Sequence, residues 1–254
     1  QVGGNGGSAI GPLLAALIVL PSGQRAILWF VVAALFALGV LVRIGRWYGR
    51  VIATRSHRSS AVADLPVFPR KTVRKAITIL VLMIFSKYFF ISCMTSYFTF
   101  FLIERFGVSV RDSQFCLFIF LAAVAIGTVA GGAIGDRYGR KYVILLSILG
   151  SAPFALALPY INLAWTIAFA VIIGLVISSA FSAIVVYATD LMPDKVGMVA
   201  GIFFGLMFGL GGIGSAFFGW LADRTSIEFI FQVSTLMPLL GIIAAWLPNI
   251  KQPR

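Results

Sequence analysis

Long apolar stretches alternate with short polar ones along almost the whole chain. Eight apolar runs fall near residues 2–20, 26–42, 76–102, 114–134, 142–159, 164–189, 197–222 and 227–247. Most of them approach or exceed the roughly 20 residues that an α-helix needs to cross a bilayer. Strands of a membrane barrel would be shorter and would alternate in polarity, which these runs do not. The pattern therefore predicts an all-α, polytopic membrane bundle of about eight transmembrane helices.

Composition supports the same class. The chain has 254 residues, of which 60% are hydrophobic and 11% are charged. Soluble domains carry about 25% charged residues, so a water-soluble fold could not hide this much apolar surface. In lipid, helices are favoured because they satisfy their own backbone hydrogen bonds.

The net charge of +12 has to be explained by its distribution along the chain. If the polar joint at 43–75 is cytoplasmic, 15 lysines and arginines fall on the cytoplasmic side and 4 on the other side. The four are Arg25, Arg105, Arg111 and Arg224. This is a strong positive-inside bias, which sets the orientation of membrane helices. The charge therefore needs no nucleic-acid partner.

One long polar segment divides the chain. Residues 43–75 are rich in arginine and serine and contain Pro66 and Pro69, as expected of a solvated linker. We expect 1–42 to hold the last two helices of an N-terminal half, and 76–254 to form a C-terminal half of six helices. Residue 1 is glutamine and the first apolar run begins at once. We therefore expect the chain to begin inside a larger protein whose first helices are missing.

A short pattern, G-x-x-x-D-R, occurs twice. It covers 132–137 and 219–224, each at the end of the second span in a group of three. The charge bias places the first copy inside and the second outside. Two three-helix units of opposite orientation are typical of the inverted repeats in secondary transporters.

The first copy continues into a longer pattern made by Gly132, Asp136, Arg137, Gly139, Arg140 and Lys141. It resembles the loop signature of the major facilitator superfamily, which lies on the cytoplasmic side between the second and third helices of a half. Gly139 permits a tight turn, and the carboxylate of Asp136 suits the exposed N–H groups of a helix start. The resemblance implies a conformational latch, with the start of the 2–20 span as its partner. The alternative is a basic turn that only fixes topology.

A second pattern, made by Gly7, Gly11 and Pro12, resembles the core of the fifth-helix signature of drug/proton antiporters in that superfamily. A later glycine pair of the signature is replaced here by Ala15 and Ala16. The alternative is a packing face of small residues with a proline kink. Longer stretches such as "GRKYVILLSILGSAPF" also resemble antibiotic efflux members of the superfamily. The resemblance implies helices five to twelve of twelve, and proton-driven export of small antibiotics, including a phosphonate.

Lys87 is the sharpest candidate for a site residue. It follows Lys75 by 12 residues, which is about 18 Å along a helix and close to mid-depth in a bilayer. A cation at that depth usually faces a cavity or a partner. We expect it to attract an anionic drug or to take up and release a proton. The alternative is a structural ion pair with a carboxylate outside this chain.

Polar side chains share one helical stripe in the same span, namely Tyr88, Ser92, Thr95, Ser96 and Thr99. They predict either a cavity lining or hydrogen bonds between helices. Asn5 in the first span and Ser178, Ser182 and Tyr187 in the sixth are further candidates for a cavity. The substrate-binding set is therefore Lys87, Tyr88, Ser92, Thr95, Tyr187 and Asn5.

Glycines recur every four residues in two spans, at 127, 131 and 135 and again at 201, 205 and 209. The first row should let a neighbouring helix approach closely, and the second should form a packing or rocking surface. Asp190 and Asp194 flank Pro193 near a helix end, where we expect them to serve capping and solubility. The alternative comes from the resemblance, because the superfamily has an acidic residue in this region.

The expected function is proton-coupled export of small drugs from a bacterial inner membrane, by a monomer in the bilayer with drug and protons as partners. No catalytic residues, metal site or cofactor are predicted, because His57 is the only histidine and no ATP-binding motif is present. The alternatives are an uptake transporter for a small organic anion and a non-transporting receptor or channel. A membrane enzyme would need clustered His, Asp or Glu within the spans, where Lys87 stands alone.

Overall fold

The chain is described by a computed structural model covering residues 2–55 and 69–248, with the side chains at 2, 52–55, 133 and 136–138 excluded. Every regular element in these residues is helical. The long helices are α1 (Val2–Leu14), α3 (Trp29–Arg55), α4 (Arg70–Phe106), α5 (Val110–Tyr138), α6 (Arg140–Ala157), α7 (Leu163–Leu191) and α8 (Val196–Ala222). Short elements complete the order: η1 (Ala15–Val19), α2 (Leu20–Ser22), η2 (Gln24–Leu28), η3 (Leu158–Tyr160), η4 (Pro193–Lys195), α9 (Ile227–Ser234) and η5 (Met237–Trp246).

Eight helical stretches among the described residues are long and apolar enough to cross a membrane, so the predicted all-α, multi-pass fold is confirmed. The chain forms two compact units. One contains residues 1–13 and 67–254, and the other contains 14–66. Both helices beside the predicted linker run further into it than the sequence suggested, because α3 continues to Arg55 and α4 begins at Arg70. Arginine and lysine are good helix formers, so charge alone does not end a helix.

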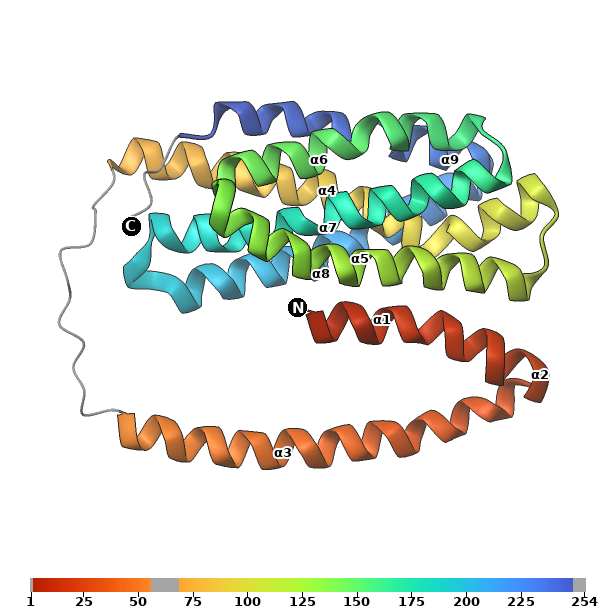
Figure 1. The fold of residues 1–254 in the computed structure, drawn as a ribbon, viewed down its shortest axis with the longest axis horizontal. Coiled ribbons are helices and arrows are strands. Elements are labelled where there is room, and N and C mark those ends of the chain that lie inside the picture. The colour runs from red at the N-terminus through yellow and green to blue at the C-terminus, as the bar shows by residue number, and fades with distance from the viewer. Residues whose placement is uncertain (1, 56–68, 249–254) are drawn as a thin grey trace. The chain divides into compact units, whose positions relative to one another are not determined.

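Within the larger unit, α4 to α8 and the last span run alternately in opposite directions (Figure 1). α4 is the central helix, and large side chains such as Phe90 and Phe98 are fully buried along it. A first core cluster gathers phenylalanines of α4, α5 and α9, and a second surrounds Leu80, Ile144 and Phe181. By contrast, little of α8 is buried, so much of its apolar surface remains uncovered by the described residues.

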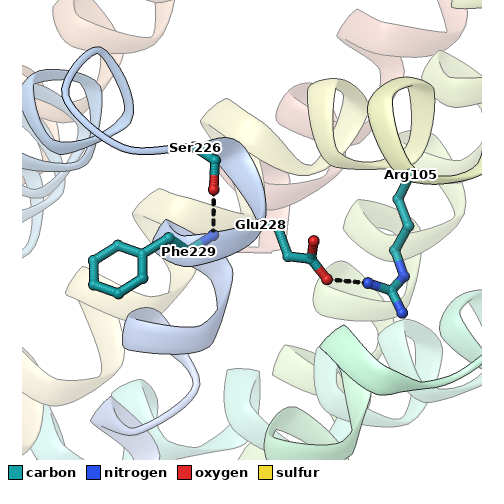
Figure 2. Close-up of polar contacts among 4 residues, drawn as sticks. All are labelled: Arg105, Ser226, Glu228 and Phe229. Atoms are coloured by element: carbon teal, nitrogen blue, oxygen red, sulfur yellow. Dashed lines mark hydrogen bonds and ion pairs between the residues drawn. The ribbon is translucent and has the colours of Figure 1, made fainter.

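The ends of the helices follow local sequence rules. Ser109, Asn162 and Ser226 each accept a backbone hydrogen bond at the start of a helix. Figure 2 shows Ser226 accepting from the N–H of Phe229, at 3.1 Å from nitrogen to oxygen. Nearby, Arg105 at the end of α4 forms an ion pair with Glu228 in the first turn of α9. These contacts tie the turn before α9 to the end of α4.

A close helix approach confirms the prediction for Gly127 and Gly131 of the first glycine row, whereas a Cβ added to Gly135 would meet only Val143, at 4.0 Å. α5 and α7 pack along their length. A methyl group added to Gly127 would collide with the carbonyl oxygen of Leu175 and the hydroxyl of Ser178, and one added to Gly131 would collide with Ser179. The backbones of the two helices therefore lie so close together that only glycine fits at these two positions.

The last apolar run is not one α-helix. α9 ends at Ser234 and is followed by the 3₁₀ segment η5, which begins near Pro238. Proline has no N–H and disfavours a helical residue before it, so the α-helical hydrogen-bond pattern is interrupted here. Gly241 lets η5 lie against α6, because its added Cβ would stand 2.9 Å from the nitrogen of Leu149.

Candidate functional site

A cavity of about 540 Å³ lies within the larger unit and is lined by α1, α4 and α8. Its lining combines hydroxyl and amide groups with aromatic and aliphatic side chains. The residues are Gly4, Asn5, Ser8, Tyr88, Ile91, Ser92, Thr95, Phe204, Met207, Phe208, Gly211, Gly212 and Ser215. None of these described lining residues is charged. A mostly apolar wall with a few polar groups is typical of small-molecule sites.

Four of the six predicted substrate-binding residues line this cavity: Asn5, Tyr88, Ser92 and Thr95. The amide nitrogen of Asn5 also donates to the hydroxyl of Thr128 on α5, at 2.7 Å. This bond fixes the orientation of the Asn5 side chain, because its amide then has a defined donor and acceptor side.

Hydroxyl groups connect α4 and α8 beside the cavity. Ser92 donates to the carbonyl oxygen of Gly211, and the hydroxyls of Ser92 and Ser96 each lie 2.8 Å from the hydroxyl of Ser215. Tyr97 donates to the carbonyl oxygen of Ser215 at the same distance. The polar stripe of α4 thus does both things that the sequence left open, since it lines a cavity and bonds to a neighbouring helix.

Small residues of α8 make room for these contacts. A methyl group added to Gly214 would stand 3.1 Å from the Cβ of Ser92, and one added to Gly219 would stand 2.6 Å from the hydroxyl of Tyr97. The helices can therefore approach closely enough for serine side chains, which are short, to bond across the interface.

Lys87 does not line the cavity. It is only 3% exposed, and its ammonium donates to the carbonyl oxygen of Ser178 on α7, at 3.4 Å. The nitrogen also lies 5.2 Å from the ring centre of Tyr88 and 5.6 Å from that of Phe181, within cation–π range. Neighbouring positions on a helix differ by about 100° in direction, so Tyr88 reaches the cavity while Lys87 points to α7. No carboxylate pairs with Lys87 among the described residues.

Tyr187 is also separate from the cavity. Its side chain is buried near the end of α7, and its hydroxyl donates to the carbonyl oxygen of Pro248. Ser178 and Ser182 bond to backbone carbonyls of their own helix and are not among the lining residues. In the described chain, Ser178, Ser182 and Tyr187 therefore bond to backbone carbonyls and do not line the cavity.

Sequence reasoning missed the contribution of α8. Phe204, Phe208, Gly211, Gly212 and Ser215 all line the cavity. Their spacing of four, three, one and three residues places them on one helical face, which is a readable signal. The glycine row of the same span lies on other positions, at 201, 205 and 209.

The second glycine row, Gly201, Gly205 and Gly209, is exposed, and an added methyl group would meet nothing within 4 Å. The same holds for Gly7 and Gly11 on α1, beside Pro12. In the part of the chain that the structure describes, neither row packs against a helix. The π-helical turn η1 follows Pro12 by three residues and relaxes the regular helical hydrogen-bond pattern there.

The two copies of the repeated pattern lie at opposite ends of the larger unit, where α5 and α8 end (Figure 1). In the first copy, Gly139 adopts φ +93, a conformation that favours glycine. The side chains of Asp136 and Arg137 lie outside the described residues, as does His57, so the latch stays a prediction. Gly132 has open space beside it, and Lys141 is half-buried.

Arg140 forms an ion pair with Asp190, which joins the start of α6 to the end of α7. Asp190 therefore has a specific cationic partner, which the interpretation as a cap or solubilising residue did not include. Sequence spacing hid the pair, since 50 residues separate the partners. Asp194 lies in η4, where its capping role is not contradicted.

The predicted latch partner of Asp136 was the start of α1. Asn5, three residues into that helix, contacts Thr128, and Asp136 follows Thr128 by eight residues. Eight helical residues span about 12 Å, so Asn5 contacts α5 well before the position of Asp136 along that helix.

No group of three or more histidine, cysteine or acidic side chains suited to a metal ion occurs in residues 2–55 and 69–248, apart from the undescribed side chains. Cys93 and Cys116 are buried free thiols in separate helices. The cavity has the volume and the mixture of polar and apolar groups of a small-molecule site, and no described cluster of groups suits acid–base or nucleophilic chemistry.

Comparison with known proteins gives consistent results. Residues 80–254 match the family described as Major Facilitator Superfamily. The chain is 51% identical over 249 residues to the "Fosmidomycin resistance protein" of Escherichia coli (strain K12), covering 98% of the chain and 61% of that protein. It is 37% identical over 257 residues to the "Uncharacterized MFS-type transporter YfnC" of Bacillus subtilis (strain 168), covering 63% of that protein. A more distant match, 25% identical over 54% of the chain and 26% of the relative, is the "Tetracenomycin C resistance and export protein" of Streptomyces glaucescens. The chain thus spans about six-tenths of the length of the first two relatives.

Proposed function

The chain belongs to the Major Facilitator Superfamily, and we propose that the protein exports small antibiotics across a bacterial inner membrane by alternating access. The cavity between α1, α4 and α8 carries this proposal. It combines hydroxyl and amide groups with aromatic side chains and has the volume of a small-molecule site.

Alternating access requires one half of a transporter to move against the other around a central site. The cavity is built where α1, from before the basic segment, meets α4 and α8, from after it. The exposed glycine rows on α1 and α8 offer smooth surfaces for such movement, because they present backbone and no side chains. We assign these rows to the moving interface.

The relative that confers fosmidomycin resistance supports a phosphonate antibiotic as one substrate. Ser92, Thr95 and Tyr88 would give such an anion a polar wall, and Ser92 and Thr95 would donate to it by exchanging their present hydrogen bonds to backbone carbonyls. The cation of Lys87 lies directly behind Tyr88, over whose ring it sits. Its positive charge therefore acts on the cavity across an aromatic ring and not by direct contact.

The energy source in this proposal is the proton gradient, with drug leaving as protons enter. Lys87 is the buried ionisable group next to the cavity wall and is our candidate for a residue that responds to proton movement. Its position between α4 and α7 allows a change in its charge to alter the packing of these helices.

The test is drug susceptibility in a host that lacks its own exporters. The complete gene should raise the fosmidomycin concentration needed to stop growth, and a protonophore should remove the difference. Accumulation of the drug, measured with and without the protonophore, separates export from other kinds of resistance. Unchanged susceptibility and unchanged accumulation, with the protein present in the membrane, would contradict the proposal.

A further inference from the structure

A second groove, of about 960 Å³, lies at one end of the larger unit. Six of its lining residues come from the start of α4 and one from η5. They are Arg70, Lys71, Arg74, Lys75, Thr78, Ile79 and Trp246, which we name the basic groove. The six positions on α4 are spaced as i, i+1, i+4, i+5, i+8 and i+9, so they form one continuous helical face.

The basic groove changes in character along its length. The first two turns of α4 present four exposed cations to the groove, and none of the residues that line the groove is acidic. The next turn presents Thr78, whose hydroxyl bonds to the carbonyl of Arg74, and the buried side chain of Ile79. Trp246 is 65% exposed at the end of η5. A cationic mouth thus leads to an apolar end bordered by an indole.

The length of α4 places this change at the membrane surface. Its 37 residues span about 55 Å, whereas the hydrocarbon core is about 30 Å thick. The charged first two turns therefore extend beyond the hydrocarbon, and the apolar end of the groove begins within it. Tryptophan is enriched at this boundary, where its ring lies at headgroup level.

Charge and polarity together select the occupant. Four like charges within two helical turns repel one another and favour a bound anion. A soluble anion would use the cationic mouth but gain nothing from Ile79 and Trp246. An anionic phospholipid matches both parts, since its phosphate meets the cations and its acyl chains follow the apolar end. Basic pockets between membrane helices on the cytoplasmic side bind such headgroups.

We propose that the basic groove is a binding site for the phosphate of an anionic phospholipid of the cytoplasmic leaflet. The site is independent of the drug cavity, because the two share no lining residue. A phospholipid bound in the basic groove holds the start of α4 at the membrane surface, at the end of the basic segment 43–75.

The test uses the complete protein in a neutral detergent and follows its thermal unfolding as lipid is added. The probes are short-chain phosphatidylglycerol, the matching phosphatidylcholine and inorganic phosphate. Phosphatidylglycerol should raise the melting temperature with a saturable dependence on concentration, and the other two should have little effect. The double variant Arg70→Gln, Arg74→Gln should weaken the apparent affinity by about 30-fold, at about 1 kcal/mol for each cation removed.

Two matched variants decide between specific and general charge effects. Arg70→Lys with Arg74→Lys keeps both charges and should bind nearly as the parent does, which also shows that the helix start tolerates substitution. Arg111→Gln with Arg224→Gln removes two exposed cations that lie outside the basic groove, at the start of α5 and just after α8, and should leave lipid binding unchanged. Equal stabilisation by inorganic phosphate, equal loss in both glutamine variants, or no effect of phosphatidylglycerol on the parent would each overturn the proposal.

Discussion

The ammonium of Lys87 donates to the carbonyl oxygen of Ser178, with 3.4 Å between the two atoms. A charged side chain of α4 is thus bonded to the backbone of α7. It lies on the far side of Tyr88 from the cavity that Tyr88 lines. A buried cation with a single long hydrogen bond is expensive to keep in an apolar surrounding. This cost is the reason why we propose a role for Lys87 beyond packing.

Lys87→Met should therefore separate stability from function. Methionine has a similar length and no charge, so we expect the free energy of unfolding to stay the same or rise by about 1 kcal/mol. Drug resistance should be lost, while the amount of protein in the membrane holds. Lys195→Met, at an exposed position in η4, is the control and should change neither quantity. Full resistance in Lys87→Met would limit this residue to a structural role.

Ser92→Ala and Ser96→Ala form a matched pair. Both serines contact the hydroxyl of Ser215, but Ser92 lines the cavity and Ser96 does not. Ser96→Ala should lower the unfolding free energy by about 0.6 kcal/mol, typical of one hydrogen bond between membrane helices, and Ser92→Ala by about twice as much because Ser92 also bonds to Gly211. Only Ser92→Ala should also raise the drug concentration that gives half-maximal transport in vesicles. Equal transport constants in the two variants would argue against binding at this wall.

Gly131→Ala should destabilise the bundle by about 1–3 kcal/mol, because the added methyl group collides with Ser179 across the α5–α7 interface. Gly150→Ala is the control, since its added methyl group would stand 3.8 Å from Val176 in ordinary contact. The melting temperatures of the two variants in detergent give the comparison. The explanation fails if Gly150→Ala lowers the melting temperature as much as Gly131→Ala does.

The Arg140–Asp190 pair should be measurable by a double-mutant cycle. Arg140→Gln, Asp190→Asn and the double variant should show a coupling energy of about 0.5–1 kcal/mol, because the pair is partly exposed to solvent. The coupling should shrink as salt is added, since ions screen exposed charges. A coupling energy near zero at low salt would show that the contact contributes nothing to stability.

The chain 1–254 alone should not transport. It spans about six-tenths of its relatives, and alternating access requires two halves that move against each other. Purified 1–254 in liposomes should show no drug uptake when a proton gradient is imposed, while the complete protein should. Gradient-driven uptake by 1–254 would show that this part of the sequence holds the whole machinery.

The sequence by itself determined the class of the fold and the number of spans. Both depend on local properties, because each helix in lipid must be apolar over its own length and satisfy its own backbone. Close packing at Gly127 and Gly131 was also readable, since a row of glycines has few other uses in a membrane helix. Polarity made Asn5, Tyr88, Ser92 and Thr95 candidates for a cavity lining, with bonding between helices as the alternative for the α4 residues, and the structure places all four at the cavity.

The tertiary structure alone decided which side chains meet. Periodicity tells which residues share a helix face but not which helix that face contacts. It therefore could not show that Lys87 turns to Ser178, that Asp190 pairs with Arg140, or that α8 forms a cavity wall. These pairings depend on how separate helices are arranged against one another, and that arrangement is a property of the whole bundle and not of any one segment.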